Sequence, residues 1–141
     1  MEKSTPFMNL PHGFPFRMID RVLEVEPGRR AVAVKQVSID EPYLQGHYPK
    51  EPLLPSLLIL EALAQTAGMA FLSSTEGKEG VPFLAKVETF RVDGKVLPGD
   101  SLTLEAEIEH IFSNLAKVRV RARVEEEVVA EGVVVLARGT G

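Results

Sequence analysis

The sequence predicts an α+β domain in which a curved, mostly antiparallel sheet of about five to six strands wraps around one long buried helix. The segment Ser56–Ser73 is apolar nearly all round, which indicates a helix that is buried on most of its sides. The segments before and after it are rich in β-branched residues or alternate apolar with polar residues, and both patterns are typical of strands.

Two strands are expected ahead of the helix. Met18–Glu26 is closed by the turn pair Pro27-Gly28, and Ala31–Ser38 is rich in β-branched residues. A proline-dense loop around residues 42–55 then leads to the helix, for which Ser56 is a suitable N-cap.

Four strands are expected after the helix, at Val81–Val92, Ser101–Phe112, Leu115–Val124 and Val128–Ala137. The second of them has an acidic face and the third a basic face, so cross-strand ion pairs would support an antiparallel register between them. These two faces consist of Glu105, Glu107, Glu109 and Lys117, Arg119, Arg121, Arg123. The apolar run 133–137 in the last strand indicates that part of the sheet is covered on both faces, as a dimer interface would do.

Length and composition fit a single domain that spans residues 1–141. The chain has 141 residues, 45% of them apolar, which is enough for one core. Its net charge is −4 and it has no basic stripe, so nucleic acid is not an expected partner. It has no cysteine, which excludes disulfides and thiolate catalysis, and its three histidines are too widely separated for a metal site.

We expect a cytoplasmic protein that does not cross a membrane. The N-terminus lacks the long apolar core of a secretory signal. The apolar stretch 53–72 is interrupted by polar residues, and one of them, Glu61, would be costly in lipid as an uncompensated carboxylate.

The candidate catalytic pair is His47 and Glu61. His47 lies in a turn made rigid by glycine and proline, and Glu61 lies inside the most apolar helix, where burial would favour its acid form. Such a base and such an acid are what moving a proton and expelling a hydroxyl require. Each also has a structural explanation, because His47 could brace its loop and the stripe of Glu61, Gln65 and Gly68 could face solvent.

Ser56 offers a hydroxyl and a backbone N–H to the same region. Its neighbours Pro55 and Leu57 are not the glycines of a nucleophile elbow, so we interpret the hydroxyl as a helix cap. Its backbone N–H would point out of a helix N-terminus, where a developing oxyanion can bind.

These residues, with others along most of the chain, resemble the β-hydroxyacyl-acyl-carrier-protein dehydratases of type II fatty acid synthesis. The matching motifs are Leu10-Pro11-His12, Pro15-Phe16, Asp20-Arg21, Glu41-Pro42, Gln45-Gly46-His47-Tyr48-Pro49, Pro52, Pro55, Leu58-Ile59-Leu60-Glu61-Ala62-Leu63-Ala64-Gln65 and Pro98-Gly99-Asp100. The resemblance implies the hot-dog fold, which agrees with the wrapped helix predicted from the residue patterns.

The resemblance also implies a reaction, the dehydration of (3R)-hydroxyacyl thioesters bound to acyl carrier protein, which gives trans-2-enoyl thioesters and needs no cofactor. By resemblance, His47 is the base at C2, and Glu61 from the partner subunit protonates the departing hydroxyl. The backbone N–H at Ser56 would hold the thioester oxygen, and Gln65 would support the polar end of the site. A homodimer would then be required for activity, and trimers of dimers are common in the family.

The chain departs from the family pattern at several places, and two other functions stay open. Glycine is usual where Ser56 stands, and arginine is usual where Gly13 stands. The stretches Asp93-Gly94-Lys95 and Phe112-Ser113-Asn114 are typically more basic. The cations that remain for docking the carrier protein at the tunnel mouth are Arg17, Arg21, Lys86, Arg91 and Lys95. The alternatives are a hot-dog acyl thioesterase and a non-catalytic acyl-thioester-binding subunit in which Ser56 disables the site.

Overall fold

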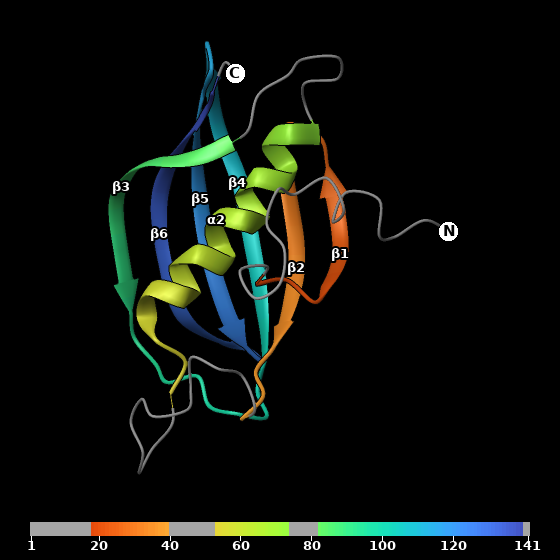
Figure 1. Ribbon diagram of the computed structural model, residues 1–141, viewed down its shortest axis with the longest axis vertical. Coiled ribbons are helices and arrows are strands. Elements are labelled where there is room, and N and C mark those ends of the chain that lie inside the picture. Colours follow the sequence, from red (N-terminus) through yellow and green to blue (C-terminus); the bar gives the residue numbers. More distant parts are fainter. Residues whose placement is uncertain (1–17, 40–52, 74–81, 140–141) are drawn as a thin grey trace.

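In the part of the chain that the structure describes, one helix packs against a curved antiparallel sheet (Figure 1). The computed structural model describes residues 18–39, 53–73 and 82–139. Within these ranges the elements are β1 (Arg21–Glu26), β2 (Arg30–Gln36), α2 (Ser56–Ser73), β3 (Pro82–Val92), β4 (Ser101–Phe112), β5 (Leu115–Val124) and β6 (Glu127–Arg138).

The helix and the strands β4 and β5 have the bounds that the sequence predicted, whereas β1, β2 and β6 differ at their ends. The largest difference is at β1, which begins at Arg21 instead of Met18. The backbone N–H of Met18 is used by a side chain of the helix, Gln65, and the pairing of β1 with β2 begins only after it. At Met18, a hydrogen bond to the helix therefore takes the place of the strand pairing that the sequence pattern predicted.

The strands lie in the spatial order β1-β2-β4-β5-β6-β3, and every neighbouring pair is antiparallel. The helix α2 crosses one face of the sheet and contacts all six strands (Figure 1). The α+β architecture with a wrapped helix is therefore confirmed. Strands β1 and β3 form the two edges of the sheet. β3 is the first strand after the helix, and it pairs with the last strand, β6.

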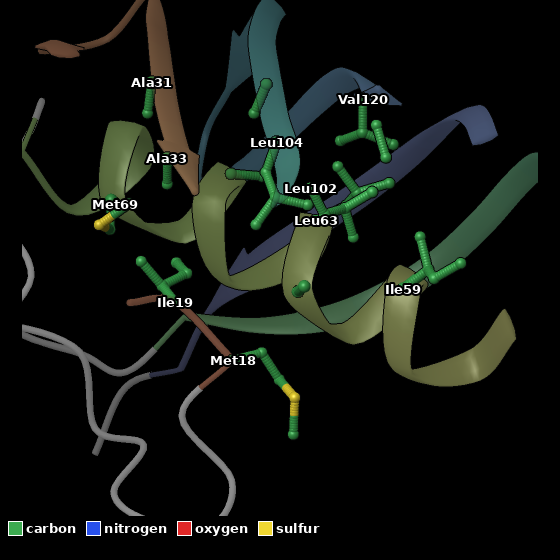
Figure 2. Packing of buried hydrophobic residues seen from close by; sticks show 14 of the residues in the cluster. Met18, Ile19, Ala31, Ala33, Ile59, Leu63, Met69, Leu102, Leu104 and Val120 are labelled. Atoms are coloured by element: carbon green, nitrogen blue, oxygen red, sulfur yellow. The ribbon is translucent and has the colours of Figure 1, made fainter. Parts of the chain in front are cut away.

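The core lies between α2 and the face of the sheet that the helix covers (Figure 2). Ile59, Leu63 and Met69 of the helix, together with Leu102 and Leu104 of β4, are each at most 1% exposed. Three alanines of the helix are fully buried and allow the sheet to approach closely: Ala62, Ala67 and Ala70. One hydrophobic cluster thus joins the helix and the strands, while the extent of the domain over residues 1–141 stays a prediction.

The opposite face of the sheet carries the charged residues, in the register that the sequence predicted. Glu105 of β4 lies opposite Arg121 of β5. Its two carboxylate oxygens pair with Arg121 Nε at 3.5 Å and with Arg123 Nη2 at 2.6 Å. Arg119 pairs with Glu109. The predicted ion pairs between the two strands are therefore confirmed for Glu105 and Glu109.

The helix α2 begins one residue earlier in its hydrogen bonding than expected. The backbone N–H of Ile59 donates to the carbonyl oxygen of Pro55 at 3.2 Å, so Pro55 is the N-cap and Ser56 is the first helical residue. The prediction that Ser56 caps the helix is wrong for this reason. A proline is tolerated here because no helical hydrogen bond requires its backbone nitrogen. No helix in the described ranges has the length and apolar character needed to span a membrane.

Candidate active site

The candidate acid, Glu61, is held by a neighbouring amide on the same helix. Glu61 and Gln65 are one turn apart on α2, and Gln65 Nε2 donates a hydrogen bond to Glu61 Oε2 at 2.7 Å. Gln65 is 2% exposed and Glu61 is half-buried. The sequence had left open whether this stripe faces solvent, and the burial of Gln65 and Gly68 excludes that interpretation for these two residues.

The other end of the Gln65 amide is also occupied. The backbone N–H of Met18, just ahead of β1, donates to Gln65 Oε1 at 2.9 Å. Met18 is 3% exposed, and its side chain belongs to the hydrophobic core (Figure 2). Gln65 therefore connects the candidate acid to a fixed point of the backbone from another part of the chain.

A small cavity of about 50 Å³ runs along this stripe of the helix. The helix contributes one face of it, and the edge strand β3 together with β6 contributes the other. Its lining consists of Glu61, Ala64, Gln65, Gly68, Pro82, Phe83, Leu84 and Leu136. Apart from Glu61 and Gln65, these residues are apolar or lack a side chain, so the space beside the Glu61 carboxyl group is mostly apolar.

Sequence reasoning missed the part of this cavity that the sheet contributes. Phe83 and Leu84 lie opposite Ala137 and Leu136 of β6, and a β-bulge follows them between Leu84 and Lys86. No local pattern indicates that β3 returns to the helix face that carries Glu61. The regular spacing of Glu61, Gln65 and Gly68 was the only local signal, and it indicated the helix side alone.

Ser56 lies in the first turn of α2, on the same helix as Glu61, and it is exposed. It lies five positions before Glu61, which corresponds to about 7.5 Å along the helix axis. The first N–H groups of a helix have no acceptor within the helix, and they lie at the positive end of its dipole. The backbone N–H of Ser56 thus has the character that an oxyanion requires.

The candidate base, His47, lies outside the described residues, as does Arg17. Among the described residues, no group of three or more histidine, aspartate and glutamate side chains is arranged to hold a metal ion. The described part of the site accordingly comprises one carboxyl group, the amide that holds it, a helix N-terminus and an apolar cavity.

A six-stranded antiparallel sheet that wraps one helix is the hot-dog fold, and solved structures share it. The dehydratase heterocomplex ApeI:P from Xenorhabdus doucetiae has a TM-score of 0.75 at 18% identity and covers 99% of this chain and 93% of its own. The protein PH1136 from Pyrococcus horikoshii has a TM-score of 0.71 at 20% identity and covers 91% and 88%. At these identities the likeness establishes the fold alone.

The chain belongs to the FabA-like domain family, whose model matches residues 10–136. A relative from Ruminiclostridium cellulolyticum is 49% identical over 125 residues, which are 87% of each chain, and one from Clostridioides difficile is 42% identical over 128 residues, which are 91% and 90%. Both are described as 3-hydroxyacyl-[acyl-carrier-protein] dehydratase FabZ. The resemblance noted in the sequence is therefore confirmed.

Proposed function

We propose that this protein dehydrates (3R)-hydroxyacyl thioesters bound to acyl carrier protein, which gives trans-2-enoyl thioesters for fatty acid biosynthesis. The observation that carries the proposal is the carboxyl group of Glu61, held by Gln65 beside an apolar cavity, in a chain 49% identical to a dehydratase of this kind. An elimination of water needs an acid at the leaving hydroxyl, and the half-buried Glu61 beside an apolar cavity suits that role.

In the proposed reaction, His47 is the base and Glu61 is the acid. His47 takes the proton from C2 while the bond between C3 and its hydroxyl oxygen breaks. Glu61 gives its proton to the departing hydroxyl, which leaves as water. The thioester itself acidifies C2, so no cofactor is required. Charge that develops on the thioester oxygen is stabilised by the backbone N–H of Ser56 at the helix N-terminus.

A homodimer is part of the proposal, because Glu61 would meet the His47 of a second copy. The edge strand β3 supports this arrangement. It is longer than the other edge strand, β1. Its apolar side chains Phe83 and Val87 are 51% and 39% exposed. A long edge with exposed apolar side chains is a template for pairing with another chain, and a second copy would cover it. Because members of the family commonly assemble into trimers of dimers, the proposal extends to that assembly.

The carrier-protein docking surface is proposed to centre on Lys86. Arg91 donates to Asp93 at 2.8 Å and to Glu131 at 2.6 Å, and the Asp93 carboxylate beside it raises the pKa of Arg91. Its charge is therefore largely compensated within the chain. Lys86 is exposed and forms no ion pair with any residue of the described ranges.

The proposed reaction in fatty acid biosynthesis also implies a cytoplasmic protein, which fits a chain without cysteine.

The test of the reaction is absorbance in the enoyl-thioester band on mixing the purified protein with a 3-hydroxyacyl thioester. The reaction should also be run from the enoyl side, because it is reversible. Turnover in both directions, lost in His47→Ala, is the expected result. Release of free acid and thiol would identify a thioesterase instead. Binding of the thioester without turnover would identify a non-catalytic subunit, and Ser56→Gly would then show whether the serine is the cause.

The docking surface has its own test. Lys86→Glu should raise KM for carrier-bound substrate about 10-fold, because a like charge would face the acidic carrier protein. The same variant should leave the turnover of a coenzyme A thioester unchanged. Equal effects on the two substrates would show that Lys86 does not contact the carrier protein.

A further inference from the structure

A row of apolar residues crosses four strands on the outer face of the sheet, the face that points away from the helix. Phe112 of β4 lies opposite Leu115 of β5. Ala137 of β6 lies opposite both Leu115 and Phe83 of β3. Directly opposite residues of an antiparallel sheet share a face. Ala116, the neighbour of Leu115, is fully buried in the core, so this apolar row faces away from the helix.

The apolar row stands out on the outer face, which elsewhere carries ion pairs such as that of Glu105 with Arg123. Phe112 is 65% exposed, and Phe83 and Leu115 are 51% and 36% exposed. Neighbouring strands are about 4.8 Å apart, so four strands span roughly 14 Å, slightly more than the width of one helix with its side chains. Apolar side chains that are exposed together in this way mark an interaction site.

The end of the hairpin that carries this row is held in place. Ser113 has a φ of 58° and forms the turn together with Asn114. The Asn114 carbonyl oxygen accepts a hydrogen bond from the Arg138 backbone N–H at 2.9 Å, and Asn114 Nδ2 donates to the Arg138 carbonyl oxygen at 3.1 Å. Because these bonds connect the turn to the end of β6, Phe112 and Leu115 present a preorganised surface.

The next row on the same face is basic. His110 lies opposite Lys117, and its ring stacks on that of Phe112 with 6.2 Å between the centroids. Lys117 and Lys86 lie on either side of the same residue of β6. Lys117 is paired with Glu88 at 3.4 Å, whereas Lys86 has no ion pair among the described residues. An apolar row beside a basic row fits a partner whose surface is acidic and also carries apolar side chains.

The apolar row reaches the candidate active site through Phe83. This residue ends the row at the sheet edge, and it also lines the cavity beside Glu61. A partner that docks on the row is therefore next to the cavity that the candidate acid borders. A carrier protein must be held in such a position to deliver a tethered substrate.

We infer that the apolar row of Phe83, Leu115 and Phe112 docks the acidic acyl carrier protein by apolar contact, next to the cation Lys86. This rests on the proposed dehydration of carrier-bound substrate, and it specifies where the carrier protein is held and by which forces. Because salt does not screen apolar contacts, this part of the docking keeps its strength at high ionic strength.

The kinetic test compares Phe112→Ser with Ile111→Ser in the full-length protein. Ile111 is the matched control, because it is 39% exposed on the same hairpin but lies opposite the buried Ala116, on the other face. Phe112→Ser should raise KM for carrier-bound substrate about 10-fold, because it removes an aromatic side chain from the interface, and should leave kcat unchanged. Turnover of a coenzyme A thioester should be unchanged in both variants.

Salt separates apolar docking from ionic docking. The effect of Phe112→Ser on KM should persist from low salt to 1 M salt, whereas that of Lys86→Glu should shrink. Equal effects of Phe112→Ser on the two substrates, or an equal effect of Ile111→Ser, would overturn the inference. A changed oligomeric state of Phe112→Ser in analytical ultracentrifugation would also overturn it, because a second copy would then cover the row.

A binding measurement separates this inference from the proposed reaction. Isothermal titration calorimetry with carrier protein that bears no acyl group reports docking without turnover. If the wild type binds it without dehydrating the thioester, and Phe112→Ser but not Ile111→Ser weakens binding about 10-fold, the reaction fails while the docking surface stands. If carrier-bound substrate is turned over but all three proteins bind the carrier equally, the reaction stands and the docking surface is overturned.

Discussion

The two faces of the helix α2 are built on different rules. The face toward the sheet consists of apolar side chains at most 1% exposed, among them Ile59 and Leu63, which pack against β4 and β5. The face toward the edge strand β3 carries Glu61 and Gln65 and borders a cavity of about 50 Å³. The first face stabilises the fold by removing apolar surface from water, whereas the second keeps polar groups and unfilled space beside them.

This difference teaches that one helix can separate stability from chemistry by the direction of its side chains. Leu63 lies two residues from Glu61 and two from Gln65, yet the first lies in the core and the others line the cavity. A substitution on the sheet side should therefore change the free energy of unfolding, and one on the cavity side should change the rate. Each prediction below tests whether the two effects can be separated in this way.

The largest effect is expected for Glu61→Gln on the cavity side. Removing a general acid should lower kcat about 100- to 10,000-fold, which is roughly 3 to 5 kcal/mol in the activation free energy. Glutamine keeps an oxygen that can accept the hydrogen bond from Gln65, so the melting temperature should stay unchanged. The measurements are steady-state kinetics and thermal unfolding of the same preparation. A large loss of stability would show that Glu61 belongs to the core and would break the comparison.

The counterpart on the sheet side is Leu63→Ala, with an effect of about 2 to 5 kcal/mol on the free energy of unfolding. Leu63 is fully buried beside Leu102 and Leu104, so its removal leaves a cavity in the centre of the core (Figure 2). Urea denaturation would give the value. At a temperature where the variant is folded, kcat should lie within about twofold of the wild type, because the cavity-side residues are unchanged. A loss of kcat as large as that of Glu61→Gln would show that the two faces are coupled.

Gly68→Ala tests both faces at once, because the two expected effects have opposite signs. Gly68 lines the cavity one turn beyond Ala64, so a methyl group there would shorten the space for an acyl chain. Turnover of the longest accepted thioesters should fall about 10- to 200-fold relative to that of short ones, since one carbon in an apolar pocket is worth about 1 to 3 kcal/mol. Alanine in place of a helical glycine should also stabilise the fold by up to about 1 kcal/mol. Equal rate losses for every chain length would show that Gly68 does not lie along the acyl chain.

The sequence predicted the sheet side of this comparison well and the cavity side only in part. Hydrophobic pattern and β-propensity are local, and they determined the bounds of α2, β4 and β5. No local pattern predicts the hydrogen bond from the Met18 backbone to Gln65. Nor does any local pattern predict that Phe83 of β3 lines the same cavity as Gln65. Both depend on packing between segments that are far apart in the sequence. The N-cap was assigned to Ser56 because serine favours that position, and the structure uses Pro55.

Arg138 secures the end of α2 that lies farthest from Ser56, and its replacement should have an intermediate effect. Its guanidinium stacks over the ring of Phe71 at 4.5 Å and donates from Nη2 to the Phe71 carbonyl oxygen at 3.0 Å. Burial lowers the pKa of Arg138, and its Nε has no hydrogen-bond partner among the residues that the structure describes. Arg138→Lys should cost about 1 to 3 kcal/mol in the free energy of unfolding, because a compact, strongly hydrated ammonium cannot stack as a guanidinium does.

Arg138→Met gives the informative comparison at that position. It removes the buried charge and keeps an unbranched apolar side chain beside Phe71, so it should destabilise less than lysine does. Urea denaturation of the two variants would rank them. If methionine proved the more damaging, the hydrogen bond to the helix C-terminus would outweigh the desolvation of the charge.

The smallest effect is expected on the outer face of the sheet, away from both sides of the helix. Glu105→Gln breaks the pairs with Arg121 and Arg123, and it should cost at most about 1 kcal/mol, because partly exposed ion pairs are screened by water and salt. Glu107→Gln is the matched control. Glu107 lies on the same face opposite Arg119, yet it forms no ion pair among the described residues. Urea denaturation at low and at 1 M salt should show a difference between the two variants that shrinks with salt. A difference that persists at 1 M salt would mean that Glu105 stabilises the fold by packing. The outer face of the sheet would then be stabilised in the same way as the core.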